Sequence, residues 1–265
     1  MSFKFTANIG LMFKEAGSLE KRFEAAKKAG FTAVECAFPY SSPIDQLTAA
    51  RNQSGLEVTL INSYPGNLEA GDLGTACIPH RQHEFEKGIE QSITYANALH
   101  CKRMHVMAGK EPPFGDCAME ESYITNLKFA AERLLKEGIT AFIEPINQQI
   151  TAPRYFLHSF HKAVEYIKKV DHPNLKLQLD FYHLQLLHGN VTQILKDYLP
   201  YVGYIQLAQA PHRNEPNSPG EINFAYVFDI LKEVGYTGYI GLEYNPVGDT
   251  NDGLKWMSEL QLSLK

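Results

Sequence analysis

Apolar and polar positions alternate in two regular ways along this chain. Short runs rich in apolar and β-branched residues, typical of buried strands, are separated by longer stretches whose apolar residues recur at helical spacing. The first pattern predicts eight strands, at 3–9, 33–37, 57–63, 103–109, 140–144, 175–180, 202–208 and 239–243. The second predicts eight helices, at 18–29, 43–54, 80–98, 119–137, 157–169, 185–198, 222–234 and 252–262.

Several of the predicted helices carry recognisable end signals. Ser18 and Pro43 suit the starts of the first two helices. A glycine, the residue that most easily adopts a left-handed cap, follows four of the helices, at Gly30, Gly55, Gly138 and Gly235. Eight strand–helix units at this length predict an α/β fold, a (β/α)8 TIM barrel that forms a single domain over residues 1–265.

An open, doubly wound sheet is the alternative architecture for this alternation. It finds no support, because no G-x-G-x-x-G follows the first strand and no G-x-x-x-x-G-K-[ST] occurs in the chain. No linker rich in Pro, Gly and Ser divides the sequence. The longest irregular segment, 63–81, follows the third predicted strand, and we expect it to act as a lid over the site, since long loops are often functional.

Polar residues stand at the ends of four successive predicted strands: Glu144, Asp180, Gln206 and Glu243. In a barrel these strand ends share one mouth, where the chemistry of this architecture is found. Three carboxylates brought together there repel one another unless some are protonated or a cation lies between them. An all-oxygen ligand set suits Mg²⁺ or Mn²⁺ better than Zn²⁺. For any single acid, a helix cap or a solvent-facing carboxylate is the alternative.

Four further residues beyond the strand ends are candidates for binding a substrate. His183 follows Asp180 by three positions, and His212 and Arg213 begin the loop after the seventh predicted strand. Lys110 follows the fourth. An arginine at the mouth can hold a carboxylate through two hydrogen bonds, whereas loop arginines are more often solvated. A histidine near a metal can donate to a substrate oxygen, although a structural histidine is the alternative.

Two titratable residues fall inside predicted strands. Glu35 lies in the second strand and is a candidate either for lining the site and binding substrate or for bonding inside the barrel. His105 lies in the fourth, and we expect a structural role or a position behind the residues that touch substrate.

Composition excludes several classes of protein. The chain has 25 Lys plus Arg against 30 Asp plus Glu, a formal charge of −5, and its basic residues are scattered, which argues against nucleic acid as a partner. No signal-peptide core and no run of eighteen apolar residues is present, so we expect a cytoplasmic protein with no membrane partner. The four cysteines lack zinc-ligand spacing, and free thiols are expected.

Six segments taken together resemble a known family. They are "FTANIGLMF", "VECAFPY", "FIEPIN", "LQLDFYH", "YIQLAQAPHRNEPNSPGEINF" and "GLEYNP". In order and spacing they resemble the hydroxypyruvate isomerases of the xylose-isomerase-like barrel superfamily, nearly from end to end. The resemblance implies a TIM barrel that converts hydroxypyruvate to tartronate semialdehyde. It also implies Glu144 and Glu243 as the catalytic pair, and these two with Asp180 and Gln206 as ligands of a divalent metal.

The sequence also departs from related enzymes of this superfamily. Ketose epimerases usually have a histidine at the position of Gln206, and a further substrate-contacting glutamate where this chain reads "NQQI". Both differences disfavour a ketohexose epimerase. The resemblance leaves open an isomerase of four-carbon oxo acids. A nuclease family shares the barrel, but its chemistry needs many histidines and a basic groove, which the acidic charge disfavours. A binding barrel without activity is a third alternative.

The chemistry of a carbonyl shift agrees with these residues. It removes a proton beside the carbonyl, forms an enediolate, and returns a proton to the neighbouring carbon. A metal stabilises the negative charge, and two carboxylates serve as base and acid. For the carboxylate of a small oxo-acid substrate we expect Arg213 first, Lys110 second and His183 third. The sequence leaves the formation of a homo-oligomer open.

Overall fold

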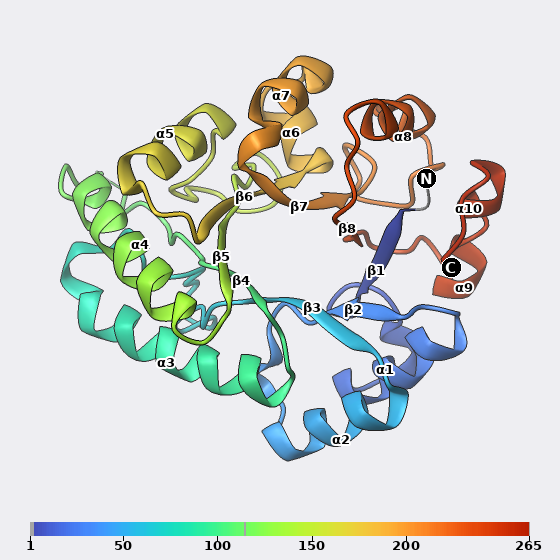
Figure 1. Ribbon diagram of the computed structural model, residues 1–265, viewed down its shortest axis with the longest axis horizontal. Coiled ribbons are helices and arrows are strands. Elements are labelled where there is room, and N and C mark those ends of the chain that lie inside the picture. Colours follow the sequence, from blue (N-terminus) through green and yellow to red (C-terminus); the bar gives the residue numbers. More distant parts are fainter. Residues whose placement is uncertain (1–2, 114, 265) are drawn as a thin grey trace. The chain divides into compact units, whose positions relative to one another are not determined.

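Eight parallel strands close into one barrel in chain order (Figure 1). The computed structural model describes residues 3–113 and 115–264. The strands are β1 (Lys4–Asn8), β2 (Ala33–Glu35), β3 (Glu57–Asn62), β4 (Arg103–His105), β5 (Thr140–Ile143), β6 (Leu175–Asp180), β7 (Val202–Leu207) and β8 (Tyr239–Leu242). The predicted barrel and all eight predicted strands are confirmed. β4 is the most shortened, ending four residues before the predicted boundary.

The helices alternate with these strands along the chain. They are α1 (Leu19–Lys28), α2 (Ile44–Ser54), α3 (Gln82–Ala98), α4 (Met119–Leu135), α5 (Phe160–Val170), α6 (Phe181–Leu187), α7 (Val191–Tyr198), α8 (Phe224–Glu233), α9 (Thr250–Gly253) and α10 (Trp256–Glu259). The four glycines expected to end helices all have positive φ, between 65° and 99°. Within the described residues, no helix is both long and apolar enough to cross a bilayer.

Two helix predictions were wrong. The segment 185–198 forms two helices, because Gly189 and Asn190 both adopt left-handed backbone conformations, with φ of 60° and 46°. α6 also starts earlier than expected, at Phe181, where β6 passes into a helix without a loop. In place of one helix over 252–262 there are two short helices of four residues each, α9, which already begins at Thr250, and α10.

The chain divides into two compact units, so the single domain over residues 1–265 stays a prediction. The first unit comprises Met1–Thr59, Leu179–Pro200 and Tyr204–Lys265. In it, Gly241 of β8 pairs with Gln206 of β7 on one side and with Thr6 of β1 on the other. Asn8 of β1 pairs in turn with Glu35 of β2. This register brings polar side chains of β1, β2, β7 and β8 together.

The second unit comprises Leu60–Gln178 and Tyr201–Gly203. Its strands pair through Met104 of β4 with Ala141 of β5, and through Ile143 of β5 with Leu177 of β6. All four of these residues are fully buried. The pairing places Glu144, which directly follows β5, beside Gln178 of β6.

The 63–81 segment belongs to the second unit and is tied to its surroundings at several points. Gly74 forms an antiparallel bridge with Ala108, and the Cys77 amide donates to the Ala108 carbonyl over 2.8 Å. Arg81 holds Asp72 through two hydrogen bonds of 2.8 and 2.6 Å. The segment is therefore an anchored loop, and its action as a lid stays a prediction.

Candidate active site

Glu35 ends β2 inside the first unit, where it is 1% exposed. Its Oε1 accepts a hydrogen bond from the Tyr204 hydroxyl over 2.7 Å. Its Oε2 accepts from the Gln206 amide over 2.8 Å and from the Asn8 amide over 3.1 Å. Burial, followed by the nearby charge of Glu243, raises the pKa of Glu35 to about 8 despite these donors.

Asp180 ends β6 and at the same time caps α6. Its Oδ1 accepts the Tyr182 backbone N–H over 2.9 Å, which satisfies a donor at the helix start. Its Oδ2 lies 3.7 Å from Nε2 of His183, which is likewise buried in the first turn of α6. Burial raises the pKa of Asp180 to about 7, although Arg213 acts in the opposite direction.

Arg213 brings a positive charge to two carboxyl groups of the first unit. Its Nη2 lies 3.1 Å from Glu243 Oε2 and 3.5 Å from Asp180 Oδ2. The guanidinium also lies over the Tyr182 ring, 5.0 Å from its centre. Burial raises the pKa of Glu243, and the guanidinium opposes that shift. Asp180 at the end of β6, Glu243 after β8 and Arg213 in the loop after β7 thus form one cluster.

The loop that carries Arg213 is clamped to the segment after β8. The Asn245 backbone N–H donates to the Arg213 carbonyl over 2.7 Å, and the Asn214 amide donates to the Asn245 carbonyl over 2.8 Å. Buried Glu215 accepts the Val247 N–H over 3.0 Å. These bonds hold Arg213 at φ of 58°, a left-handed conformation that costs energy in a residue other than glycine.

Glu144 follows β5 in the second unit and is 4% exposed. Its Oε2 accepts a hydrogen bond from Gln178 over 2.9 Å and lies 3.2 Å from Nδ1 of His105. Burial lowers the pKa of His105 to about 3, so this imidazole is neutral at physiological pH. In the part of the chain that the structure describes, neither ring nitrogen of His105 makes a well-aligned hydrogen bond, so the structural or supporting role expected for it stays a prediction.

Lys110 and His212, both predicted to bind substrate, have surroundings of a different kind. Lys110 pairs through its backbone with Tyr155, and its charge contributes to lowering the pKa of Asp72 in the 63–81 loop. His212 is exposed. Binding of substrate by either residue stays a prediction.

The acids fit a divalent cation. Asp180 Oδ2 and Glu243 Oε2 are buried, and within the described residues neither accepts a well-aligned hydrogen bond. Buried oxygens of this kind are costly unless a cation or proton meets them. Within the first unit, buried His183 lies 3.7 Å from Oδ2 of Asp180, so both side chains could contribute to holding a metal ion. His183, expected to bind substrate, thereby also becomes a candidate ligand.

Several residues of these clusters were missed by reading strand ends alone: Asn8, Gln178, Tyr182 and Tyr204. Two of them could have been found from the period of a strand. Gln178 and Tyr204 stand two residues before Asp180 and Gln206 in the same strands, and alternate residues share a face. Asn8 is the last residue of β1 and was missed because the predicted strand continued to residue 9. Tyr182 gave no such signal, because its position depends on the turn into α6.

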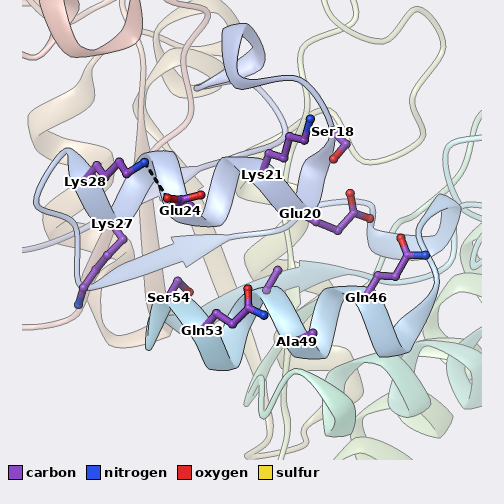
Figure 2. Close-up of a pocket in the computed structure, with 11 residues that line it drawn as sticks. Ser18, Glu20, Lys21, Glu24, Lys27, Lys28, Gln46, Ala49, Gln53 and Ser54 are labelled. Atoms are coloured by element: carbon purple, nitrogen blue, oxygen red, sulfur yellow. Dashed lines mark ion pairs between the residues drawn. The ribbon is translucent and has the colours of Figure 1, made fainter.

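A polar groove between α1 and α2 lies away from the buried acids of the first unit. Figure 2 shows its lining, in which Lys28 pairs with Glu24 over 2.6 Å. Both side chains are more than 70% exposed, so this pair contributes little to binding or stability.

Buried strand-end acids with a fixed arginine, set in a closed parallel barrel, define a TIM-barrel enzyme whose mouth fits a divalent cation. The chain belongs to the xylose isomerase-like TIM barrel family, whose model matches residues 23–260. A putative hydroxypyruvate isomerase of Danio rerio is 48% identical over 96% of this chain and 94% of its own length. A hydroxypyruvate isomerase of Escherichia coli K12 is 39% identical over 96% and 98%.

A third relative carries another substrate in its name. A 2-oxo-tetronate isomerase of Pectobacterium atrosepticum is 41% identical over 96% of both chains. Because relatives at 39–48% identity are named as isomerases over nearly the full length, this chain is an isomerase.

Solved structures agree with the fold. One from Brucella melitensis, described as an AP endonuclease of family 2, superposes with a TM-score of 0.92 at 38% identity and covers 97% of this chain and 98% of its own. The apo 3-keto-D-glucoside 4-epimerase of E. coli superposes with a TM-score of 0.76 over 97% of this chain and all of its own. At 22% identity, that second likeness shows the fold alone.

Proposed function

We propose that this enzyme interconverts hydroxypyruvate and tartronate semialdehyde by proton transfer through an enediolate. The observation that carries the proposal is the buried carboxyl of Asp180 and the largely buried carboxyl of Glu243, held beside one arginine. Such a site suits a small anion that loses and regains a proton. Relatives named hydroxypyruvate isomerase support the three-carbon substrate, and the relative named 2-oxo-tetronate isomerase supports a four-carbon oxo acid as the second candidate.

The acid–base work is assigned to Glu243 and Glu144. Burial raises the pKa of Glu243, which brings its affinity for a proton closer to what transfer near neutral pH requires. Gln178 donates to Oε2 of Glu144 and so fixes the plane of that carboxyl. One glutamate removes the proton beside the carbonyl, and the other returns a proton at the neighbouring carbon.

The proposed ligands of Mg²⁺ or Mn²⁺ are Glu144, Asp180, Gln206 and Glu243, with His183 as a further donor. When bound, the cation supplies positive charge where the substrate oxygens become negative. The protein's own part is to present Asp180 through Oδ2, since Oδ1 is engaged by the start of α6.

Arg213 is assigned to the substrate carboxylate. The planar fork of donors of a guanidinium matches a carboxylate. A divalent cation held by Asp180 and Glu243 would offset their negative charge, so Arg213 could interact with the substrate instead. Lys110, His183, His212 and Glu35 remain predicted contacts of lower rank. A cytoplasmic location and a small oxo acid as the partner, with neither nucleic acid nor membrane, also belong to this proposal, which leaves a homo-oligomer open.

The test replaces Glu243 with glutamine and measures turnover, with bound metal quantified in the same samples. We expect Glu243→Gln to lose at least roughly 10²-fold in kcat, since general acid–base catalysis contributes about that much. The matched control is Glu259→Gln in α10, an exposed glutamate. Wild-type protein is assayed with hydroxypyruvate, 2-oxo-tetronate and a ketose. Near-normal turnover of the metal-loaded Glu243→Gln protein would refute the two-glutamate scheme, and a preference for 2-oxo-tetronate would favour the second candidate.

A further inference from the structure

We infer that Glu35 is a positioning residue that fixes the side-chain amide of Gln206 with its carbonyl oxygen turned toward the cation site. The inference deepens the proposed function and rests on it, because it takes Gln206 as one of the metal ligands. It assigns Glu35 to holding a ligand and no longer to contact with substrate.

The orientation of the Gln206 amide follows from its partner. Nε2 of Gln206 lies 2.8 Å from Oε2 of Glu35. A cation bound nearby favours the ionised form of Glu35. In that form the carboxylate only accepts hydrogen bonds, so the reversed amide would place two acceptor oxygens against each other at this distance. The carbonyl oxygen of Gln206 must therefore point away from Glu35, and an oxygen is what a hard divalent cation takes from an amide.

Glu35 is itself held at both oxygens. Asn8 donates to Oε2, and Tyr204 donates to Oε1. The Tyr204 hydroxyl is in contact with the Thr59 hydroxyl over 2.9 Å, which in turn lies 3.1 Å from the Thr6 hydroxyl. All of these polar groups are buried, and every link lies within the first unit. The chain of bonds anchors Glu35 to the strands beneath it, as outer partners of metal ligands commonly are.

The backbone of β8 leaves room for this arrangement. Gly241 lies between Gln206 and Thr6 in the strand register. A Cβ at this position would overlap Oε1 of Glu35 and would lie 2.8 Å from Cγ of Gln206. The φ of Gly241 is not in the left-handed region, so the glycine is required here for space. The absence of a side chain at Gly241 therefore allows Glu35 and Gln206 to come into contact.

The network predicts which substitution at position 35 preserves it. A glutamine can donate to Tyr204 if the tyrosine turns its proton to Thr59, because Thr59 lies 3.1 Å from the Val34 carbonyl and can donate there. The side-chain oxygen of glutamine then still accepts from Asn8 and Gln206. Glu35→Gln keeps the positioning contact without the charge, whereas Glu35→Ala removes both.

The experiment measures the affinity of the full-length protein for Mn²⁺ by electron paramagnetic resonance. We expect Glu35→Ala to bind Mn²⁺ roughly 10- to 100-fold more weakly, the usual effect of removing an outer partner of a ligand. Glu35→Gln should restore most of the affinity. In a Gln206→Leu background, Glu35→Ala should cost less than about twofold more, since the residue acts through Gln206. With saturating Mn²⁺, kcat of Glu35→Ala should recover.

Each other outcome overturns the inference. Unchanged Mn²⁺ affinity in Glu35→Ala, or a Glu35→Gln protein as weak as Glu35→Ala, shows that positioning is not its role. The inference is also overturned if the losses of Mn²⁺ affinity from Glu35→Ala and Gln206→Leu add up in the double variant. A low kcat of Glu35→Ala that saturating Mn²⁺ does not restore would overturn it as well. If Glu35→Ala does not fold by circular dichroism, Tyr204→Phe is measured instead, and wild-type affinity there overturns the inference. If wild-type protein does not bind Mn²⁺, the proposed metal site itself is overturned, and this result is distinct from a failure of the Glu35 inference alone.

Discussion

Nη2 of Arg213 lies 3.1 Å from Oε2 of Glu243, and the same nitrogen lies 3.5 Å from Asp180. One guanidinium thus lies beside two carboxyls, buried Asp180 and largely buried Glu243, and opposes the rise in pKa that burial causes in both. The arginine and the proposed metal ion serve the same acids, so the arginine's charge becomes available to a substrate when the metal is present. The loop that holds Arg213 is clamped through Asn214 and Glu215, which keeps its guanidinium near this position.

Replacing Arg213 tests whether this residue binds the carboxylate of the substrate. We expect Arg213→Ala to raise KM for hydroxypyruvate roughly 10- to 100-fold, the value of a hydrogen bond to a charged group. Arg213→Lys should recover only part of this, because an ammonium lacks the planar fork. Steady-state kinetics with hydroxypyruvate and with glyceraldehyde, which has no carboxylate, provide the measurement. Arg133→Lys, on the surface beside Glu90, is the control. An equal rise in KM for both substrates would show that Arg213 does not bind the substrate carboxylate.

The metal-free protein should become less stable as pH rises. Burial raises the pKa of Glu35 to about 8 and that of Asp180 to about 7, above the values near 4 of unfolded chains. Between these limits the folded state binds more protons than the unfolded state, so the free energy of unfolding falls with pH. The stabilisation is complete below about pH 4 and is lost as pH passes through 7 to 8.

The measurement is thermal unfolding of EDTA-treated protein between pH 5.5 and 8.5. Each carboxyl contributes at most about 1.4 kcal/mol per pH unit. Glu35→Gln should flatten the slope, since an amide does not titrate. Added Mg²⁺ should stabilise the protein more at pH 8 than at pH 5.5, because ligands must lose their protons to bind it. A metal-free stability that rises with pH over this range would contradict the assignment.

Gly241→Ala should disturb the centre of the first unit. The added methyl overlaps Glu35, and such overpacking typically costs about 1–3 kcal/mol. We therefore expect a lower unfolding temperature together with weaker Mn²⁺ binding. Gly248→Ala is the matched control, because a Cβ there meets no atom within 4 Å and its backbone is not left-handed. Equal stability and affinity in the two variants would rule out the crowding described at β8.

Asp72→Asn tests how firmly the 63–81 loop is held. Arg81 lowers the pKa of Asp72 and binds it through two bonds, but both side chains are partly exposed. Global stability should therefore change by no more than about 1 kcal/mol. Hydrogen exchange of amides in 66–78 should become faster, and activity should respond only if the loop closes over substrate. Unchanged exchange would show that the bridge of Gly74 to Ala108 suffices.

The strand ends were predictable from sequence for a physical reason. In "LKLQLD" the apolar residues face one way, and the run stops at the charge of Asp180, so period and polarity coincide at the boundary. The same holds for Ile143 before Glu144 and Leu242 before Glu243. Helix ends at glycines were equally readable. Because strand ends of a barrel share one mouth, the acids of the candidate site followed from the fold.

The contacts and helix boundaries that could not be predicted from sequence depend on strand register and on local geometry. Glu35 meets Tyr204 and Gln206 from strands far along the chain, and no spacing encodes that contact. The start of α6 at Phe181 was missed because strand and helix share a residue and no loop residues mark the change. The break at Gly189 was missed because a single glycine inside a helical pattern is often tolerated.

The two carboxylate oxygens of Asp180 have different roles: Oδ1 caps α6, and Oδ2 faces the candidate site. An asparagine could keep the cap with its oxygen but would then turn an NH₂ group toward the cation. A glutamate would carry the charge but place it one methylene away from the cap. Evolution at this position is therefore constrained twice, and a saturation library at position 180 should return no substitute that preserves both the fold of the β6–α6 corner and metal affinity.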